Sequence, residues 1–151
     1  MGYLMRRNIL TYKAPPNNEG YDLICIHPNP RKSGRQVRVQ VKSRLATDSD
    51  RGFPVKARTL DAFDYLIVVF LNVGYFFGKM KRGCSRAGAT APEFYTFPAA
   101  FIRSHHDSRS SWEKVRTRGL DIEQYKNEAG FEVIAQDLEV PYPEKREQGD
   151  V

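Results

Sequence analysis

A strict alternation of apolar and polar residues over positions 36–44 constrains the fold of this chain more than any other stretch. Valines occupy 37, 39 and 41, and the intervening positions carry the polar set Gln36, Arg38, Gln40, Lys42 and Arg44. Successive side chains of a strand point to opposite faces, so this pattern predicts a strand that buries its valines and presents its polar residues together. A preceding strand is expected over residues 22–26, and the turn-forming residues 27–34 separate the two.

The remaining elements predict an α/β fold with a mixed central sheet flanked by helices. Residues 65–71 form a continuous β-branched and aromatic run, which indicates a strand buried on both faces. Shorter strands are expected at 9–13 and 94–97, with a hairpin partner at 75–81. Helices are expected at 3–8, at 99–104 after Pro98, and from Asp121, with Gly130 as an interruption and Phe131, Ile134 and Leu138 as an apolar stripe. We expect one domain over 1–140 and a polar, disordered tail over 141–151.

The charge of the chain is distributed unevenly. The net charge is +6 over 151 residues, but residues 1–60 carry +8, residues 61–120 carry +4 and residues 121–151 carry −6. A basic field of this kind attracts phosphate backbones. The sequence shows no secretory signal, its longest apolar run is too short to span a bilayer, and its two cysteines suit a reduced compartment. These features favour a cytoplasmic protein with no membrane segment.

The two central strands bring chemically useful groups together. If they pair, the Asp22 carboxylate, the Gln40 amide and the Lys42 ammonium can converge, and the backbone carbonyl of Val41 adds another oxygen. Magnesium prefers oxygen ligands and keeps several waters, so one or two carboxylates can hold it. A lysine beside the metal can orient the attacking water or stabilise charge on a phosphate.

In Asp22 followed by Gln40-Val41-Lys42, the chain resembles the PD-(D/E)XK nuclease superfamily, over roughly residues 3 to 82. The stretches YDLI, VRVQVKSR and FDYLIVVF are similar to restriction-endonuclease-like and Holliday-junction-resolvase-like members. The resemblance implies a divalent-metal-dependent DNA endonuclease that uses Mg²⁺ or Mn²⁺ and acts, in many members, as a homodimer. By position, Asp22 and Gln40 match the metal ligands, with the Val41 carbonyl beside them, and Lys42 matches the catalytic lysine. Contacts to DNA phosphates are then expected from Lys32, Arg35, Arg38 and Arg44.

Two departures from the superfamily pattern bear on activity. Gln40 stands where an acidic residue is usual, and a neutral amide binds a metal more weakly than a carboxylate does. The superfamily also opens with a helix that bears a glutamate, whereas no acidic residue here precedes Glu19. The first residues are expected to be the last turns of such a helix, in a shortened chain or one that lost the helix. Glu19 is a weak candidate to compensate.

Other interpretations stay open at this point. The chain could be a catalytically impaired nuclease-like DNA-binding module, or a basic α/β domain that acts on RNA. Asp61 and Asp64 are expected to flank a strand rather than to bind metal. The run His105-His106-Asp107 lacks further ligands at zinc spacing. Trp112 is expected to pack in the core, with base stacking as the alternative because basic residues surround it.

Overall fold

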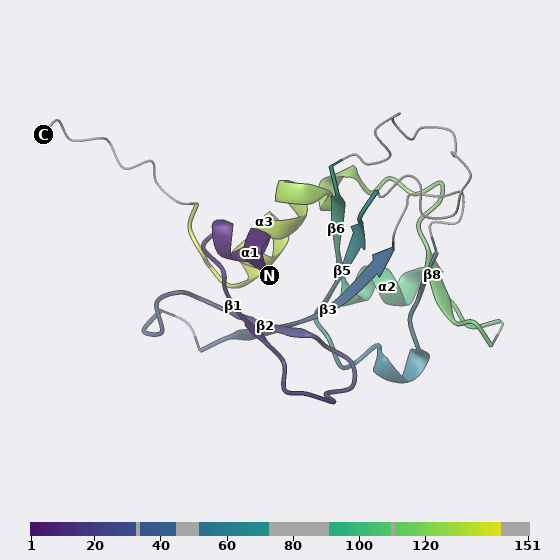
Figure 1. Cartoon of the computed structure of the whole chain (residues 1–151), viewed down its shortest axis with the longest axis horizontal. Coiled ribbons are helices and arrows are strands. Elements are labelled where there is room, and N and C mark those ends of the chain that lie inside the picture. The colour runs from purple at the N-terminus through teal and green to yellow at the C-terminus, as the bar shows by residue number, and fades with distance from the viewer. Residues whose placement is uncertain (33, 45–51, 73–90, 110, 143–151) are drawn as a thin grey trace, which may run out of the picture.

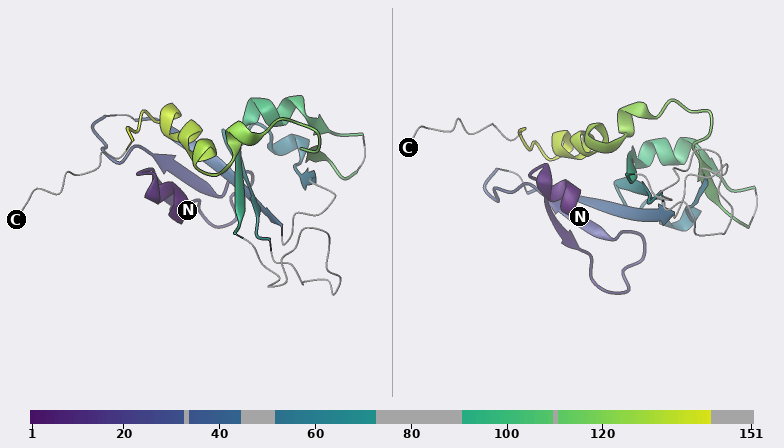
Figure 2. Two further views of the ribbon diagram at one scale, coloured as in Figure 1. Left: turned by 90° about the horizontal axis from the view of Figure 1, so that it is seen from above. Right: turned by 45° about the horizontal axis from the view of Figure 1, so that its top comes forward.

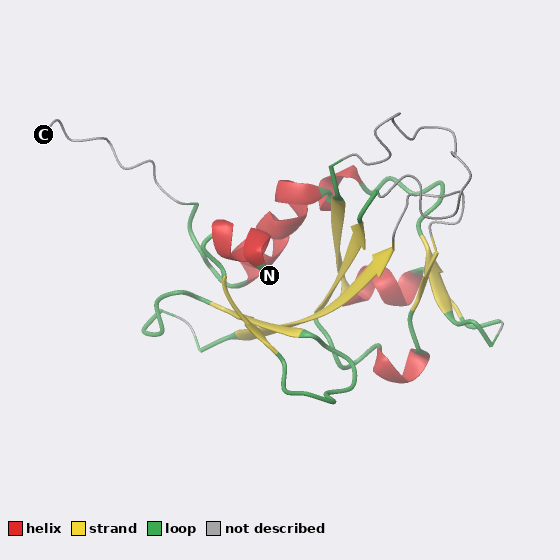
Figure 3. Ribbon diagram, viewed as in Figure 1, coloured by secondary structure: helices red, strands yellow, loops and turns green. Residues whose placement is uncertain are grey.

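The computed structural model describes residues 1–32, 34–44, 52–72, 91–109 and 111–142, and its centre is a five-stranded mixed sheet (Figures 1 and 3). The strand order is β1–β2–β3–β5–β6, in which β3 and β5 run parallel and the other neighbours run antiparallel. The bounds are β1 Leu10–Lys13, β2 Leu23–Ile26, β3 Gln36–Arg44, β5 Tyr65–Phe70 and β6 Glu93–Pro98. The predicted α/β class with a mixed central sheet is confirmed.

Helices and a smaller sheet flank the central one. The helices are α1 Gly2–Arg6, α2 Ala99–Ser104 and α3 Asn127–Asp137, with the 3-10 turns η1 Ala57–Thr59 and η2 Glu123–Tyr125. A three-stranded sheet is ordered β4–β8–β7, with β4 Gly52–Pro54, β7 His106–Asp107 and β8 Lys114–Arg116. Figure 1 shows α1 and α3 on one side of the central sheet and α2 with β8 on the other, and Figure 2 gives two further views.

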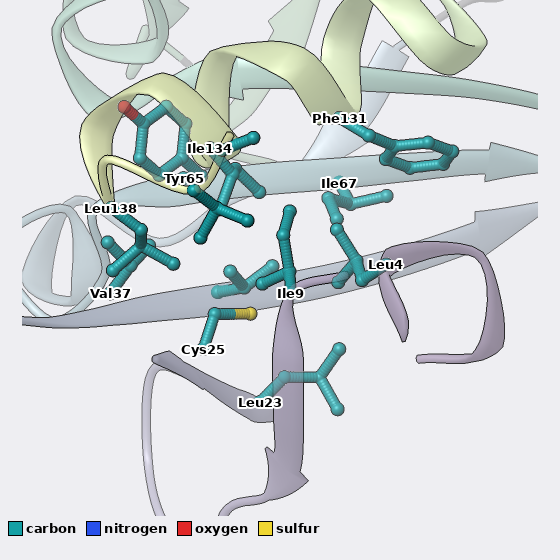
Figure 4. Packing of buried hydrophobic residues seen from close by; sticks show 13 residues of the cluster. Leu4, Ile9, Leu23, Cys25, Val37, Tyr65, Ile67, Phe131, Ile134 and Leu138 are labelled. Carbon is teal, nitrogen blue, oxygen red and sulfur yellow. The ribbon is translucent and has the colours of Figure 1, made fainter. Parts of the chain in front are cut away.

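The first core lies between α1, α3 and one face of the central sheet (Figure 4). The sheet contributes Val37, Val39 and Ile67, as the alternation of β3 predicts. From α3 and its C-terminal end come Phe131, Ile134 and Leu138, each 4% exposed or less. The predicted apolar stripe of this helix is therefore confirmed.

A second core fills the opposite face of the central sheet. Leu66, Val68 and Phe70 alternate with the first-core residues of β5 and contact a layer that includes Phe53 of β4 and Val115 of β8. Strand β5 is thus buried on both faces, which explains its uninterrupted apolar sequence and confirms its predicted place inside the sheet. The polar side chains of β3 share this face, because they alternate with the valines that enter the first core.

The C-terminal helix begins later than the sequence signals predict. Asp121 does not cap it, because residues 123–125 form η2 and Lys126 adopts an extended backbone that bridges to Tyr95 of β6. Asn127 then takes a left-handed φ of 49°, and its Oδ1 accepts a hydrogen bond from the Phe94 N–H at 3.0 Å. Pairing with the sheet has overridden the local capping signal.

One smaller prediction also needs correction, and two others agree with the structure. Gly130 does not interrupt α3 but lies buried inside it, where a Cβ would collide with the carbonyl oxygen of Tyr125. The helix predicted over 99–104 after Pro98 is confirmed as α2, and Pro98 is also the last residue of β6. The prediction that Asn8 ends the first helix agrees with its left-handed φ of 67°.

Some predictions fall outside the described ranges. The expected hairpin partner at 75–81 lies there, as does the tail from residue 143. Of the predicted tail, Pro141 and Tyr142 are described, and both contact Arg7. Within the described residues, no helix has the length and apolarity needed to cross a membrane.

Candidate functional site

Asp22 lies directly before β2, where the chain enters the central sheet from the loop of residues 14–21. Its N–H donates to the carbonyl of Val39 at 2.8 Å, and its own carbonyl accepts from the N–H of Ala14 at 2.8 Å. Val39 is also the register partner of Leu23. Asp22 and Leu23 thus both lie opposite Val39, as two successive residues do at a β-bulge. Bulges redirect side chains at sheet edges, and this one fixes Asp22 between the backbones of β1 and β3.

The Asp22 carboxylate is held on β3 at the residue between Gln40 and Lys42. Its Oδ2 accepts a hydrogen bond from the N–H of Val41 at 2.7 Å. The N–H and C=O of one residue in a strand face the same neighbouring strand, so the Val41 carbonyl also points toward the side where β2 begins. Asp22, Val41 and Lys13 line an open hollow of about 460 Å³. Asp22 and Val41 therefore border one accessible space.

Gln40 is more deeply buried than its place on the polar face of β3 suggested. It is 7% exposed, and its Oε1 has no hydrogen-bond partner. Leaving such an oxygen buried and unpaired costs about 1–3 kcal/mol. Gln40 follows Val39, which is the last residue of β3 in register with β2. Gln40 therefore lies opposite the point where the chain enters β2 at Asp22. Gln40 does not line the hollow that Asp22 and Val41 share.

Lys42 lies two residues beyond Gln40 and shares its face of β3. It is half-buried, and its register partner on β5 is Val68. Among the described residues, its ammonium makes no hydrogen bond or ion pair with Asp22, Gln40 or any other group. The structure thus joins Asp22 directly to Val41 and sets Gln40 and Lys42 on one strand face beside them.

These donors suit a hard divalent cation. Asp22, Gln40 and the Val41 carbonyl offer oxygen atoms alone, and the unpaired buried Oε1 of Gln40 would gain a partner from a metal or its water. The charge available is low, because the described part of the chain has no group of three acidic, histidine or cysteine residues placed to hold a metal. Glu19 is directed elsewhere, with Oε1 at 3.8 Å from Nη2 of Arg58. The donor types therefore suit Mg²⁺ or Mn²⁺ that keeps several waters, while Gln40 lies outside the hollow that Asp22 and Val41 share.

Three of the four predicted DNA contacts already have partners within the protein. Arg38 makes a bidentate pair with Asp64 through Nε at 3.2 Å and Nη2 at 3.0 Å. Arg35 pairs with Asp137, and Nη1 of Arg44 donates to the Gly52 carbonyl at 2.9 Å. Lys32 is exposed on the loop before β3. Their role in binding DNA stays a prediction.

Sequence reasoning placed Asp64 beside its strand but missed what it does. Besides its pair with the Arg38 guanidinium, its Oδ2 accepts the backbone N–H of Arg38 at 2.7 Å. Nearby, the Tyr65 hydroxyl donates to Asp137 at 3.1 Å, and burial with that carboxylate raises the pKa of Tyr65. The sequence did contain a signal for this contact. An aspartate lies directly before β5 and arginines lie at the start of β3, and the parallel pairing of these strands brings them together.

The Arg38–Asp64 pair predicts a pH-dependent contribution to stability. Burial alone would raise the pKa of Asp64, but the hydrogen bonds and charge of Arg38 hold it below its usual value. A depressed carboxyl pKa stabilises the fold above about pH 4, and this stabilisation is lost as pH falls through the folded-state pKa. We expect Asp64→Asn to lower the free energy of unfolding by about 1 kcal/mol at pH 7 and by progressively less below pH 4.

Urea unfolding from pH 3 to 7 measures this difference. Asp61→Asn is the matched control, because Asp61 is 93% exposed and its pair with Arg103 is a surface pair. An effect of Asp64→Asn that stays constant over this pH range would contradict the assigned role.

The other candidate residues behave as follows. His106 Nε2 lies 2.8 Å from the Val55 carbonyl, and Asp107 pairs with Arg109. Together with His105 they form no metal site among the described residues. The expectation that Trp112 packs in the core is wrong, because the side chain is 76% exposed.

Comparisons with known proteins give little further guidance. No family model matches the chain, and no curated protein matches it significantly. Among solved structures, the chain is similar to a bacterial homing endonuclease, I-Ssp6803I, with 17% sequence identity and a TM-score of 0.45 over 89% of this chain and 82% of that one. A likeness at this level does not carry a function from one protein to the other.

Proposed function

We propose that this chain is a divalent-metal-dependent DNA endonuclease that hydrolyses phosphodiester bonds, with a restriction-endonuclease-like fold of the PD-(D/E)XK kind. The observation that carries the proposal is the hydrogen bond from the Val41 N–H to the Asp22 carboxylate. It fixes an acidic side chain beside the strand that bears Gln40 and Lys42. The buried, unpaired Oε1 of Gln40 gives independent support, because it is an oxygen in need of a partner.

Each residue has a distinct role in this proposal. Asp22, Gln40 and the Val41 carbonyl would hold Mg²⁺ or Mn²⁺, which when bound lowers the pKa of a coordinated water and offsets charge on the phosphate. Asp22 remains anchored by Val41 through one oxygen and offers the other. The Lys42 ammonium, which has no partner in the described part of the chain, would orient the attacking water and donate hydrogen bonds to a phosphate oxygen.

The charge of the chain supports DNA as the substrate. Residues 1–60 contain the whole candidate site and carry a net charge of +8. Lys13 lines the same hollow as Asp22, so the lining includes a cationic residue. A polyanion would be drawn to this region, and its binding should weaken as salt rises. Cleavage of both strands of a duplex would require two sites, which a homodimer would supply.

A second candidate is a catalytically impaired nuclease-like module that binds DNA without cutting it. Two observations favour it: the site has one carboxylate, and Gln40 is neutral and 7% exposed. This candidate predicts salt-sensitive DNA binding that does not depend on Mg²⁺.

Cleavage of supercoiled and branched DNA, with Mg²⁺, Mn²⁺ or EDTA, separates the two candidates. Asp22→Asn keeps an oxygen that can accept from Val41 but removes the charge, so we expect cleavage to fall at least about 100-fold. Asp61→Asn removes an exposed carboxylate outside the site and should cut like wild type. DNA binding without metal-dependent cutting would favour the impaired module. Equal cutting by Asp22→Asn would refute the proposed site.

A further inference from the structure

A row of three cations lies on β8 and on the turn that follows it, away from the candidate metal site. Val115 and Thr117 point inward and are 1% and 3% exposed. The intervening residues are exposed or half-buried: Lys114, Arg116 and Arg118. Lys114 and Arg116 lie on one face of β8, about 6.7 Å apart, and Arg118 follows in the turn after the strand.

Two acidic residues, Asp107 and Glu113, lie close to this row. Asp107 is held by Arg109, with Nε at 2.9 Å from Oδ1 and Nη2 at 3.1 Å from Oδ2, and it lies 4.0 Å from Arg116. Glu113 turns to the inner side, where it accepts from the Ala57 N–H and lies 3.9 Å from His106. Residues 106–118 contain four cations, Arg109, Lys114, Arg116 and Arg118, and two carboxylates, Asp107 and Glu113, so this segment has a net positive charge.

Trp112 stands in the connection between β7 and β8, next to the start of the cation row. It is the only tryptophan of the chain, and 76% of its surface is exposed. An indole so placed leaves a large apolar face in water, where tryptophan is seldom found. Proteins that bind single-stranded nucleic acid combine a basic track for the backbone with aromatic side chains on which bases stack. The β7–β8 hairpin has both features.

We propose that this hairpin is a binding surface for single-stranded DNA, in which Lys114, Arg116 and Arg118 contact phosphates and Trp112 stacks on an unpaired base. The connection of this surface to cleavage rests on the proposed function. If both hold, the substrate of the endonuclease is DNA with unpaired bases, such as forks and junctions. The binding itself needs neither a metal nor the residues Asp22 and Lys42.

Because Trp112 is the only tryptophan, its intrinsic fluorescence reports on this surface directly. A thymidine 20-mer, a duplex of the same length and a uridine 20-mer are titrated separately in EDTA, and anisotropy of labelled oligonucleotides gives the affinities. We expect the DNA 20-mer to quench Trp112 and to bind about 5- to 150-fold more weakly to Trp112→Ala. Arg118→Gln should reduce the salt slope of binding by about 0.7, while Arg6→Gln, which removes one charge from α1, leaves the slope unchanged.

Several results would overturn the proposal. One is single-stranded binding that leaves Trp112 fluorescence unchanged, and another is an equal salt slope for Arg118→Gln and Arg6→Gln. Stronger binding and quenching by the duplex would remove the role of unpaired bases, and stronger binding by the RNA 20-mer would reassign the partner. If the protein cleaved DNA in a metal-dependent way but single-stranded DNA did not bind at the hairpin, this inference alone would be wrong. If single-stranded DNA quenched Trp112 fluorescence but no cleavage occurred, only the proposed function would be wrong.

Discussion

Replacing Lys42 with alanine is expected to lower the rate of metal-dependent DNA cleavage about 100- to 10,000-fold, the range that a positioned proton-transfer group supplies. The expected loss is large because, among the cations on the face of β3 that Gln40 shares, only the Lys42 ammonium has no partner among the described residues. Arg38 is engaged with Asp64, and Arg44 with the Gly52 carbonyl. The fold should survive, since Lys42 makes no hydrogen bond or ion pair among the described residues. Single-turnover cleavage at saturating Mg²⁺ measures the effect.

Lys56→Ala is the matched control for this experiment. Lys56 is exposed at the start of η1, so its loss removes the same charge without touching β3. We expect it to cut at a rate within about threefold of wild type, and both variants should bind DNA with similar affinity. Lys42→Ala cleaving as fast as Lys56→Ala would remove the lysine from the mechanism.

Replacing Arg7 with methionine is expected to lower the free energy of unfolding by about 2–4 kcal/mol. Arg7 is 9% exposed and makes a bidentate pair with Glu132 of α3, with Nε at 2.7 Å and Nη2 at 3.0 Å. Its guanidinium also donates to the carbonyls of Val140 and Pro141. Methionine keeps the aliphatic bulk but leaves a half-buried carboxylate and two carbonyls without their donor. This single side chain therefore connects the N-terminal helix, α3 and the segment that follows it.

Arg6→Met tests whether this effect comes from the contacts or from the charge. Arg6 is exposed on α1, and its guanidinium lies 6.0 Å from the Tyr3 ring, so the change should cost less than about 0.5 kcal/mol. Urea unfolding of both variants, together with Glu132→Gln and the double variant Arg7→Met/Glu132→Gln, isolates the pairwise coupling. Equal losses for Arg6→Met and Arg7→Met would show that the Arg7–Glu132 pair contributes nothing specific.

Most of the central sheet could be predicted from local patterns. The alternation over 36–44 gives the bounds of β3, and the doubly apolar run gives β5, because each pattern reports which faces are buried. The start of α3 could not be predicted, since Asn127 and Lys126 are held by β6, a contact between residues about 30 positions apart. Trp112 was mistaken for a core residue because residue type alone suggests burial, whereas its place in a short hairpin connection decides its exposure.

The candidate site was predictable in its components but not in its environment. The pairing of β2 with β3 follows from the sequence, and it brings Asp22 to Val41. The burial of Gln40 did not follow, because alternation assigns it to a polar face without saying that a second core covers that face. The partners of Arg38 and Arg35 were missed for the same reason: ion pairs between distant residues depend on strand order, which the alternation of a single strand does not give.

Binding of Mn²⁺, measured by electron paramagnetic resonance of the free ion, tests the central claim most directly. We predict weak binding to the wild-type protein, at least about tenfold weaker binding to Asp22→Asn, and tighter binding to Gln40→Glu, because affinity follows the number of carboxylates. Asp61→Asn should bind like wild type. If Asp22→Asn and Gln40→Glu both bound Mn²⁺ as wild type does, then Asp22 and Gln40 would not form a metal site, and the proposed mechanism would be wrong.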